Sequence, residues 1–144
     1  MTKAENIEGS IDYAKSFRGD FYSWGGDSPA GFDCSGFVCE ILKRAGLIER
    51  KSDYTAQGLW DIFKNNIVNI PYAGCLVFYY ADNDPAKAIH VELLINDYQS
   101  IGASGGGSKT TTREDAIRDN AFIKERPFNS RSNIKGFLDP FMRS

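Results

Sequence analysis

The chain has 144 residues and a formal net charge of −2, and 42% of its residues are hydrophobic and 13% aromatic. A chain of this length and composition can bury a substantial core, so we expect a single domain that spans residues 1–144. The small net charge excludes strong electrostatic attraction to nucleic acid or to an anionic membrane surface.

The chain also lacks the sequence features of membrane insertion and of signal-dependent secretion. No stretch is apolar for long enough to cross a membrane as a helix. Residues 1–6 are polar and have no apolar signal core. We therefore expect a protein that is cytoplasmic when it is synthesised, or one that leaves the cell without a signal peptide.

Helices are expected first along the chain and strands second. Thr2 and Glu5 are spaced as a capping box, and Asp33 is a candidate cap for a second helix. From the apolar periodicity, the expected helices cover residues 2–19, 34–46 and 55–63, with a short one from residue 112. The expected strands cover residues 75–80, 90–95, 98–103 and 121–125. This order favours an α+β fold in which N-terminal helices pack on an antiparallel sheet.

The connecting segments follow from their composition. A glycine-rich loop is expected over residues 20–33, a polar loop over residues 81–87, and a flexible glycine-rich stretch over residues 105–108. Residues 136–141 carry enough apolar surface to dock on the domain rather than extend from it.

Cys34 is the strongest candidate for a catalytic residue. It would lie in the first turn of the second helix, where the positive end of the helix dipole favours the reactive thiolate and lowers the pKa of a cysteine. Gly31 and Gly36 leave little bulk beside the thiol, so a substrate backbone could approach it closely. The alternative is a buried structural thiol, which is the commoner role of a free cysteine.

The other two cysteines, Cys39 and Cys75, are expected to be small buried apolar residues. The chain has three cysteines in all and no Cys-x-x-Cys pair, and it has a single histidine. This set of side chains does not predict a metal site, and we expect no metal and no cofactor.

His90 is the expected general base because no other imidazole exists in the chain. Strand alternation places Val91, Leu93 and Ile95 on one face and His90, Glu92 and Leu94 on the other. The first set is entirely aliphatic and should face the core, which leaves His90 toward a cleft. The alternative is a hydrogen-bonded structural histidine at the start of a strand.

Four blocks of sequence resemble the NlpC/P60 cysteine peptidases. Residues 22–26 read Tyr-Ser-Trp-Gly-Gly, and residues 31–38 read Gly-Phe-Asp-Cys-Ser-Gly-Phe-Val. Residues 74–78 are similar to the Gly-Asp-Leu-Val-Phe strand of that family, with cysteine in place of aspartate, and residues 90–95 are similar to its His-Val-Gly strand. The order and spacing of these blocks match over about residues 10–104. The resemblance implies a papain-like α+β core in which the helix of the nucleophile packs on an antiparallel sheet that carries the histidine.

The resemblance also implies a third catalytic group, and here the sequence departs from the family. Family members usually place a polar residue, often a second histidine, on the strand after the histidine strand, and the matching position is Gly102. We therefore expect the ring of His90 to be oriented by a backbone carbonyl, by Ser104 or by Glu92. The alternative for Glu92 is a solvated carboxylate on the strand surface.

Four further residues are candidates for substrate binding by resemblance. Tyr22 would lie beside the nucleophile, and Asp33 and Ser35 would bind the free amine of a stem peptide, since an acidic group with hydroxyls selects an ammonium. The alternative for Asp33 is a helix cap only. Trp24 could belong either to the core or to the wall of the cleft.

The expected function is that of a cysteine endopeptidase that acts on bacterial peptidoglycan. By resemblance, the bond that is cleaved joins D-glutamate to the following diamino acid of the stem peptide. Two alternatives remain: a catalytically weak or inactive module that binds the wall or serves a phage particle, and a thiol acyltransferase or amidase on the same scaffold. Residues 101–107 resemble phage-encoded and prophage-encoded members with tail or lysis functions, so the expected route to the wall is export or a phage.

Overall fold

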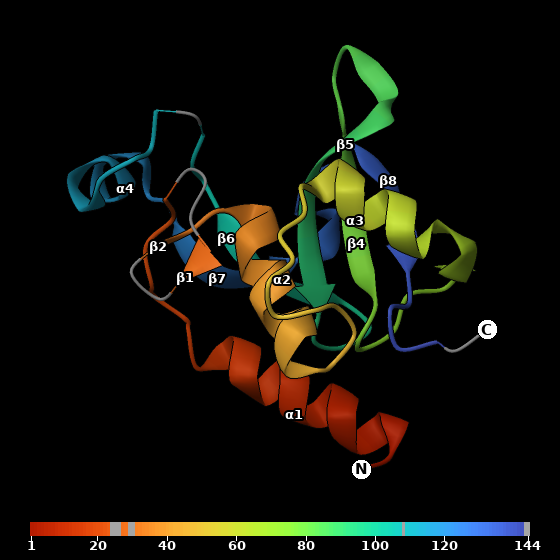
Figure 1. The fold of residues 1–144 in the computed structure, drawn as a ribbon. Helices are drawn as coiled ribbons and strands as arrows, with labels where there is room; N and C mark the ends of the chain where they lie inside the picture. The colour runs from red at the N-terminus through yellow and green to blue at the C-terminus, as the bar shows by residue number, and fades with distance from the viewer. Residues whose placement is uncertain (24–26, 29–30, 108, 143–144) are drawn as a thin grey trace.

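A six-stranded antiparallel sheet organises the fold of the computed structural model (Figure 1). The structure describes residues 1–23, 27–28, 31–107 and 109–142. The strand order in the sheet is β3-β8-β4-β5-β6-β7. In chain order these strands are β3 (Ile67–Val68), β4 (Leu76–Ala81), β5 (Asp84–Leu94), β6 (Gln99–Ser104), β7 (Phe122–Pro127) and β8 (Ile134–Leu138).

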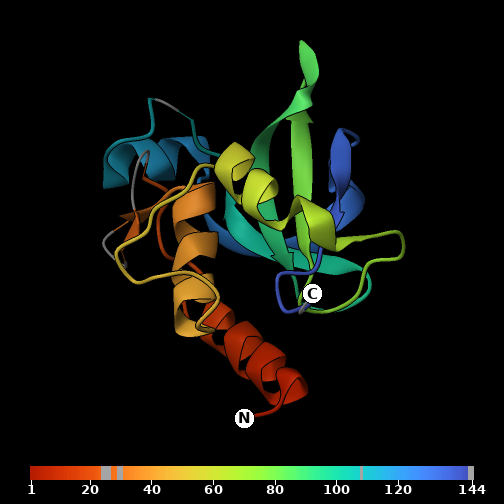
Figure 2. The same ribbon diagram turned by 45° about the vertical axis from the view of Figure 1, so that its right-hand side comes forward.

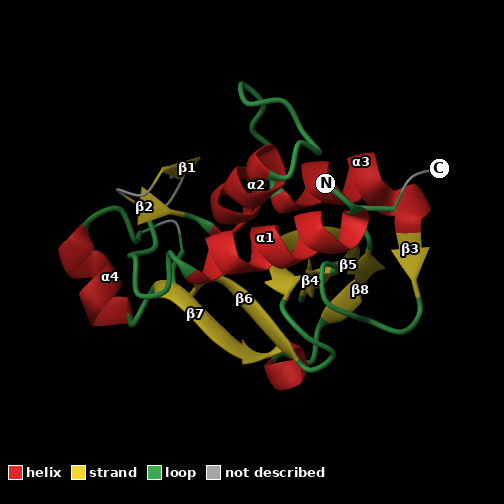
Figure 3. Cartoon of the chain, turned by 90° about the horizontal axis from the view of Figure 1, so that it is seen from below, coloured by secondary structure: helices red, strands yellow, loops and turns green. Residues whose placement is uncertain are grey.

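Three helices lie together over one face of this sheet, as Figure 3 shows from below. They are α1 (Lys3–Lys15), α2 (Cys34–Arg44) and α3 (Ala56–Phe63). Each begins at a side-chain cap that is visible in the sequence: Thr2 forms a complete capping box with Glu5, and Asp33 and Thr55 accept from backbone N–H groups of α2 and α3. These caps satisfy N–H groups that have no partner within the helix, which is why the helices start where they do.

The main core lies between the helices and the sheet. Leu76, Phe78, Val91 and Leu93 of the two central strands pack there against the apolar sides of α2 and α3. A smaller cluster on the other face contains Leu94 and apolar residues from β4 and β8. The predicted alternation of β5 is therefore confirmed, with Val91 and Leu93 in the main core and Leu94 on the opposite face.

The polar segment at residues 81–87, which was expected to be a loop, is mostly strand. β5 begins at Asp84 and pairs with β4 in a hairpin whose register shifts near Tyr79 and Tyr80. The end of this hairpin projects beyond the rest of the molecule in Figure 2. Its polar composition reflects exposure of the strand ends rather than an absence of backbone pairing, which is where the sequence-based expectation was wrong.

The C-terminal segment is more central than the sequence suggested. Residues 134–138 do not only dock on the domain: they form β8, which pairs with β4 on one side and with β3 on the other. A register between strands that are about 60 residues apart depends on non-local pairing, for which a single sequence carries little signal.

The loop expected over residues 20–33 contains short regular pieces. β1 (Asp27–Ser28) pairs with β2 (Gly31–Phe32), and Phe21 forms a bridge with Phe122 at the start of β7. The short helix expected from residue 112 is α4 (Arg113–Asp119), which Thr112 and Asp115 cap as a capping box. The helices and the antiparallel sheet together confirm the predicted α+β class.

Candidate active site

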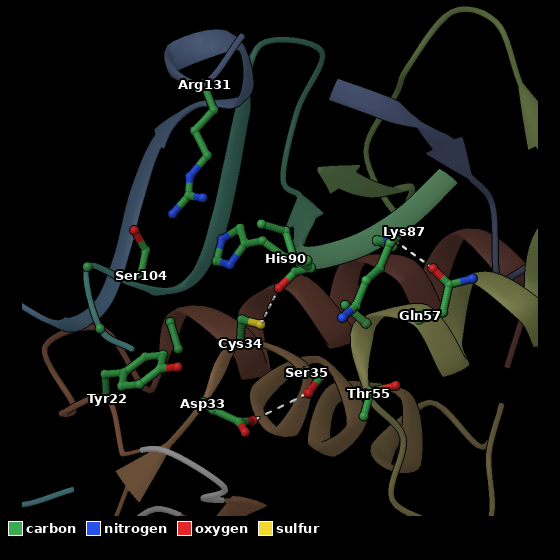
Figure 4. Close-up of a pocket in the computed structure, with 16 residues that line it drawn as sticks. Tyr22, Asp33, Cys34, Ser35, Thr55, Gln57, Lys87, His90, Ser104 and Arg131 are labelled. Atoms are coloured by element: carbon green, nitrogen blue, oxygen red, sulfur yellow. Dashed lines mark hydrogen bonds between the residues drawn. The ribbon is translucent and has the colours of Figure 1, made fainter. Parts of the chain in front are cut away.

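A cavity of about 460 Å³ opens where the N-terminus of α2 meets the sheet, and both Cys34 and His90 line it (Figure 4). The start of α3 and residues 87–90 of β5 form one part of its wall. Residues 103–106 at the end of β6, Tyr22 and Arg131 form another part. The two residues that were predicted to carry the chemistry are 56 positions apart in the sequence, and the fold brings them to one cavity.

Cys34 is the first residue of α2, and Asp33 caps the helix by accepting from the Gly36 N–H at 2.7 Å. The thiol lies 3.9 Å from the carbonyl oxygen of Ile89, the residue immediately before His90. Burial and the nearby Asp33 carboxylate raise the pKa of the Cys34 thiol to about 12. This direction is opposite to the one expected from the helix dipole: burial and the charge of Asp33 together outweigh the backbone hydrogen bonds that favour the thiolate. The cysteine is therefore a neutral thiol at rest and needs a base.

His90 is 6% exposed, and its Nε2 lies 2.6 Å from Oε2 of Glu92. The ring of Tyr79 packs against the imidazole, with 5.5 Å between the ring centroids. Burial lowers the pKa of His90, although the hydrogen bond and charge of Glu92 act in the opposite direction. Because Glu92 occupies Nε2, Nδ1 is the ring nitrogen that remains for proton exchange in the cavity.

Glu92 is fully buried and has three side-chain partners. Besides His90, it accepts from Ser100 Oγ at 2.7 Å and from Arg126 Nη2 at 2.6 Å. Burial alone would raise the pKa of Glu92, but its contacts with His90 and Arg126 outweigh burial and lower that pKa to about 2. The interpretation of Glu92 as a solvated surface carboxylate is therefore wrong. The carboxylate is ionised and held on three sides.

Gly102 makes room for this carboxylate. A Cβ atom at position 102 would lie 2.5 Å from Cγ of Glu92 and 2.9 Å from its Cδ, which is closer than carbon atoms can pack. The position at which the family resemblance implies a third side chain is thus filled by Glu92 from the neighbouring strand. Of the three partners expected for His90, the described contacts join Nε2 to Glu92, whereas Ser104 is a buried residue of the cavity wall.

The candidates for substrate binding have different outcomes. Tyr22, Asp33 and Ser35 all line the cavity. Tyr22 is buried, and Ser35 Oγ lies 3.4 Å from Oδ1 of Asp33. Asp33 is therefore both a helix cap and a carboxylate at the cavity, so the two interpretations of this residue do not compete. Trp24 lies outside the described residues.

The remaining cysteines are structural, as predicted. Cys39 and Cys75 are both fully buried, and Cys39 Sγ lies 3.6 Å from the carbonyl oxygen of Tyr54. Within the part of the chain that the structure describes, no cluster of three or more His, Cys, Asp or Glu side chains could hold a metal ion. In the same part of the chain, no helix is long and apolar enough to cross a membrane.

Sequence reasoning missed three residues at this site. Ser100 and Arg126 are directly paired neighbours on β6 and β7 and reach Glu92 from these two strands. Arg131 lines the cavity from the segment that follows η2 (Phe128–Ser130). The available signal was an arginine directly after the strand expected over residues 121–125, together with the small residues at positions 100, 102 and 104, which leave space for a charged group.

Comparison with known proteins points to one family. The model of the NlpC/P60 family matches residues 19–126. The chain belongs to the NlpC/P60 family. It is 28% identical over 100 residues to the probable peptidoglycan endopeptidase LytE of Bacillus subtilis, an alignment that covers 69% of this chain and 28% of LytE. It is 34% identical over 92 residues to a gamma-D-glutamyl-L-lysine dipeptidyl-peptidase of Bacillus cereus, over 63% of this chain and 26% of that protein.

The fold is likewise similar to a solved member of the family. The crystal structure of an NlpC/P60 family protein from Bacillus cereus superposes with a TM-score of 0.70 at 24% identity, over 92% of this chain and 38% of that chain. The chain thus spans about a third or less of the length of the two curated relatives named above. The family resemblance inferred from the sequence blocks is confirmed.

Proposed function

We propose that the protein is a cysteine endopeptidase that hydrolyses peptidoglycan stem peptides at the bond between D-glutamate and the next diamino acid. The observation that carries the proposal is the pairing of Cys34, at the first turn of α2, with the buried His90–Glu92 pair in one cavity. Membership of the NlpC/P60 family supports peptidoglycan as the substrate. The relative named as a gamma-D-glutamyl-L-lysine dipeptidyl-peptidase supports the choice of bond.

In the proposed reaction Cys34 Sγ attacks the carbonyl carbon, and the thiol proton passes to Nδ1 of His90. The imidazolium then gives this proton to the leaving amine, and a thioester between the acyl group and Cys34 remains. A water molecule attacks the thioester while His90 takes one of its protons, and that proton returns to the sulfur. The backbone N–H of Cys34, which has no partner within α2, is the natural donor to the oxyanion.

Glu92 is proposed as the positioning residue for His90. A carboxylate on Nε2 fixes the tautomer that leaves Nδ1 able to accept the thiol proton, and it stabilises the imidazolium that forms. Ser100 and Arg126 hold the carboxylate in turn. Gly102 was the one feature that favoured an inactive binding module, and the presence of Glu92 in that space removes this argument.

Asp33 is proposed to bind the free amine of a stem peptide, together with Ser35 and Tyr22. An ammonium beside Asp33 would also offset the negative charge that raises the pKa of Cys34. Substrate binding would then favour thiolate formation at the moment of attack, which suits a protein whose resting cysteine is neutral.

The proposal is tested by incubating the protein with purified peptidoglycan and with soluble stem peptides, and by measuring the mass of the released fragments. We expect fragments that end at D-glutamate, and loss of activity in Cys34→Ala and His90→Ala but not in Cys39→Ala. Transfer of the acyl group to an added amine, or release of ammonia alone, would instead identify the acyltransferase or amidase alternative. We further propose that the protein reaches the wall by export or with a phage, which fractionation of producing cells would test.

A further inference from the structure

Arg131 brings a positive charge to the cavity wall that the proposed mechanism does not use. Its guanidinium points toward the cavity from above His90 in Figure 4. The group is only partly exposed and lies over the ring of Tyr79, 5.6 Å from the ring centroid. Stacking on an aromatic ring holds a guanidinium in place while leaving its N–H groups free to donate.

The guanidinium has no hydrogen-bond acceptor and no carboxylate partner among the described residues. Arg126, its neighbour at the site, is bonded to Glu92 at 2.6 Å, and the described contacts of Arg131 are limited to the ring of Tyr79. Burial and the charge of Arg126 lower the pKa of Arg131, as expected for a cation whose charge is not balanced. A guanidinium that is partly withdrawn from water and has no partner loses hydration without compensation, so an anionic ligand would stabilise it.

The charges of the cavity are arranged asymmetrically around the reactive pair. In Figure 4, Asp33 lies on one side of Cys34 and Arg131 on the other, beyond the ring of His90. Lys87 also lines the cavity, but it is exposed and lies on the opposite side of His90 from Arg131. A ligand that spans Cys34 would therefore meet a carboxylate at one end and a guanidinium at the other.

We propose that Arg131 binds a substrate carboxylate that lies within one residue of the bond that is cleaved. The guanidinium suits this ligand because its parallel N–H groups match the two oxygens of a carboxylate. The inference rests on the proposed function for the identity of the substrate: a glutamyl residue that is linked through its γ-carbonyl keeps a free α-carboxylate. Arg131 lies beyond residues 19–126, which the family model matches, so the match itself assigns Arg131 no role.

The first test needs no substrate. Cys34 is alkylated with iodoacetate, which carries a carboxylate, and with iodoacetamide, which does not, and the labelled peptide is mapped by mass. We expect Arg131→Gln to lower the ratio of the iodoacetate rate to the iodoacetamide rate several-fold, while Arg131→Lys keeps part of it. The ratio cancels any change in the pKa of the thiol, since both reagents need the same thiolate.

Lys87→Gln is the matched control, because it removes the same charge from the wall of the same cavity. A directed contact with Arg131 predicts a much smaller effect of Lys87→Gln on the ratio. Two results would overturn the proposal. Equal effects of the two variants would show that only the overall positive charge of the cavity attracts the reagent, and no effect of Arg131→Gln would show that Arg131 does not bind an anion.

The second test compares a stem peptide that has a free glutamyl α-carboxylate with the same peptide as the α-carboxamide, and with one in which the carboxylate of the diamino acid is amidated. Loss of a charge-assisted hydrogen bond predicts that amidation of the contacted carboxylate lowers kcat/KM about tenfold or more, and that Arg131→Gln removes this difference. The amidated peptide that the wild type cleaves more slowly than the unamidated peptide identifies the carboxylate that Arg131 contacts.

If all three peptides are cleaved equally by the wild type, the proposal for Arg131 fails although the proposed peptidase activity stands. If none is cleaved but the alkylation preference holds, the anion site stands and the proposed substrate fails.

Discussion

At the scale of single residues, the proposed catalytic centre depends on the carboxylate of Glu92, which fills the space that Gly102 leaves open. Glu92 lies on the same strand as His90 and two residues after it, so strand alternation alone directs both side chains to one face. The contact at 2.6 Å with Nε2, the full burial and the bond to Arg126 make Glu92 a fixed ionised partner rather than a mobile surface group.

The first prediction concerns Glu92→Gln, a variant that keeps the shape and removes the charge. We expect kcat/KM to fall about a hundredfold or more, because the amide does not stabilise the imidazolium. Glu92 raises the pKa of His90, so its removal lowers that pKa further, and the acid limb of the pH profile should move to lower pH. Glu125→Gln on β7 is the control. A large loss of rate with an unmoved acid limb would mean that Glu92 acts only through stability.

The second prediction concerns Asp33→Asn, which keeps a competent helix cap. Asp33 raises the pKa of Cys34, so the variant should be alkylated faster than wild type at the same pH. On a stem peptide with a free amine its kcat/KM should nevertheless fall, by roughly 2–5 kcal/mol of transition-state stabilisation. N-acetylation of the peptide should cost the wild type a similar amount and the variant little. Equal cleavage of both peptides by the wild type would leave Asp33 as a cap alone.

At the scale of elements, three strands cooperate to hold one group. β5 carries His90 and Glu92, β6 supplies Ser100 and the gap at Gly102, and β7 supplies Arg126. The register of β6 with β7, which pairs Ser100 with Arg126, is therefore as important to the site as the residues themselves.

The third prediction concerns Gly102→Ala. The added methyl group would collide with Cγ of Glu92, and Glu92 cannot move without breaking its contacts. We expect a loss of about 1–3 kcal/mol in the free energy of unfolding and a fall in kcat. Gly58→Ala in α3 is the control, because its Cβ would meet only ordinary contacts at 3.4 Å or more and alanine favours a helix.

The exchange of the two positions gives a stricter check. The double variant Glu92→Ala/Gly102→His returns the third side chain to the strand where the family usually carries it. It should recover part of the activity that Glu92→Ala loses, measured on the same stem peptide. A double variant no more active than Glu92→Ala would contradict the idea that position 102 and Glu92 serve the same purpose.

The sequence predicted the elements whose signals are local. The capping box at Thr2, the cap at Asp33 and the helix start expected at residue 112 are confirmed, and alternation on β5 predicted the faces of His90 and Val91. β3 and the central position of β8 were not predicted, since they depend on pairing across the whole chain. Cys34, His90 and the candidate Glu92 could be recognised from local sequence patterns. The contacts of Arg126 and Arg131 could not, because they depend on packing between segments that are far apart in the chain.

At the scale of the whole molecule, the buried charges make stability depend on pH. The pKa of Glu92 is about 2 in the folded protein, against an ordinary value of 4.5. The unfolded chain therefore binds a proton at a higher pH than the folded chain. The stabilisation from Glu92 is complete above about pH 4.5 and is lost as the pH falls toward 2.

The fourth prediction follows from this linkage. Denaturant unfolding should show that wild type loses on the order of 3 kcal/mol more stability than Glu92→Gln between pH 5 and pH 2. The two stability curves should approach each other as the pH falls, because the protonated glutamate and the glutamine are both neutral. Parallel curves over this range would show that folding does not lower the pKa of Glu92.

The central claim is that Cys34 becomes acylated during turnover, and the direct measurement is the intact mass of the protein quenched in acid within one turnover of a stem peptide. We expect a mass increase equal to the mass of the fragment that ends at D-glutamate minus one water, because the thioester has not yet been hydrolysed, and we expect this adduct to map to Cys34 and to be absent from Cys34→Ala. Cleavage of the peptide by Cys34→Ala at the wild-type rate, or an adduct on Cys39 or Cys75, would contradict it.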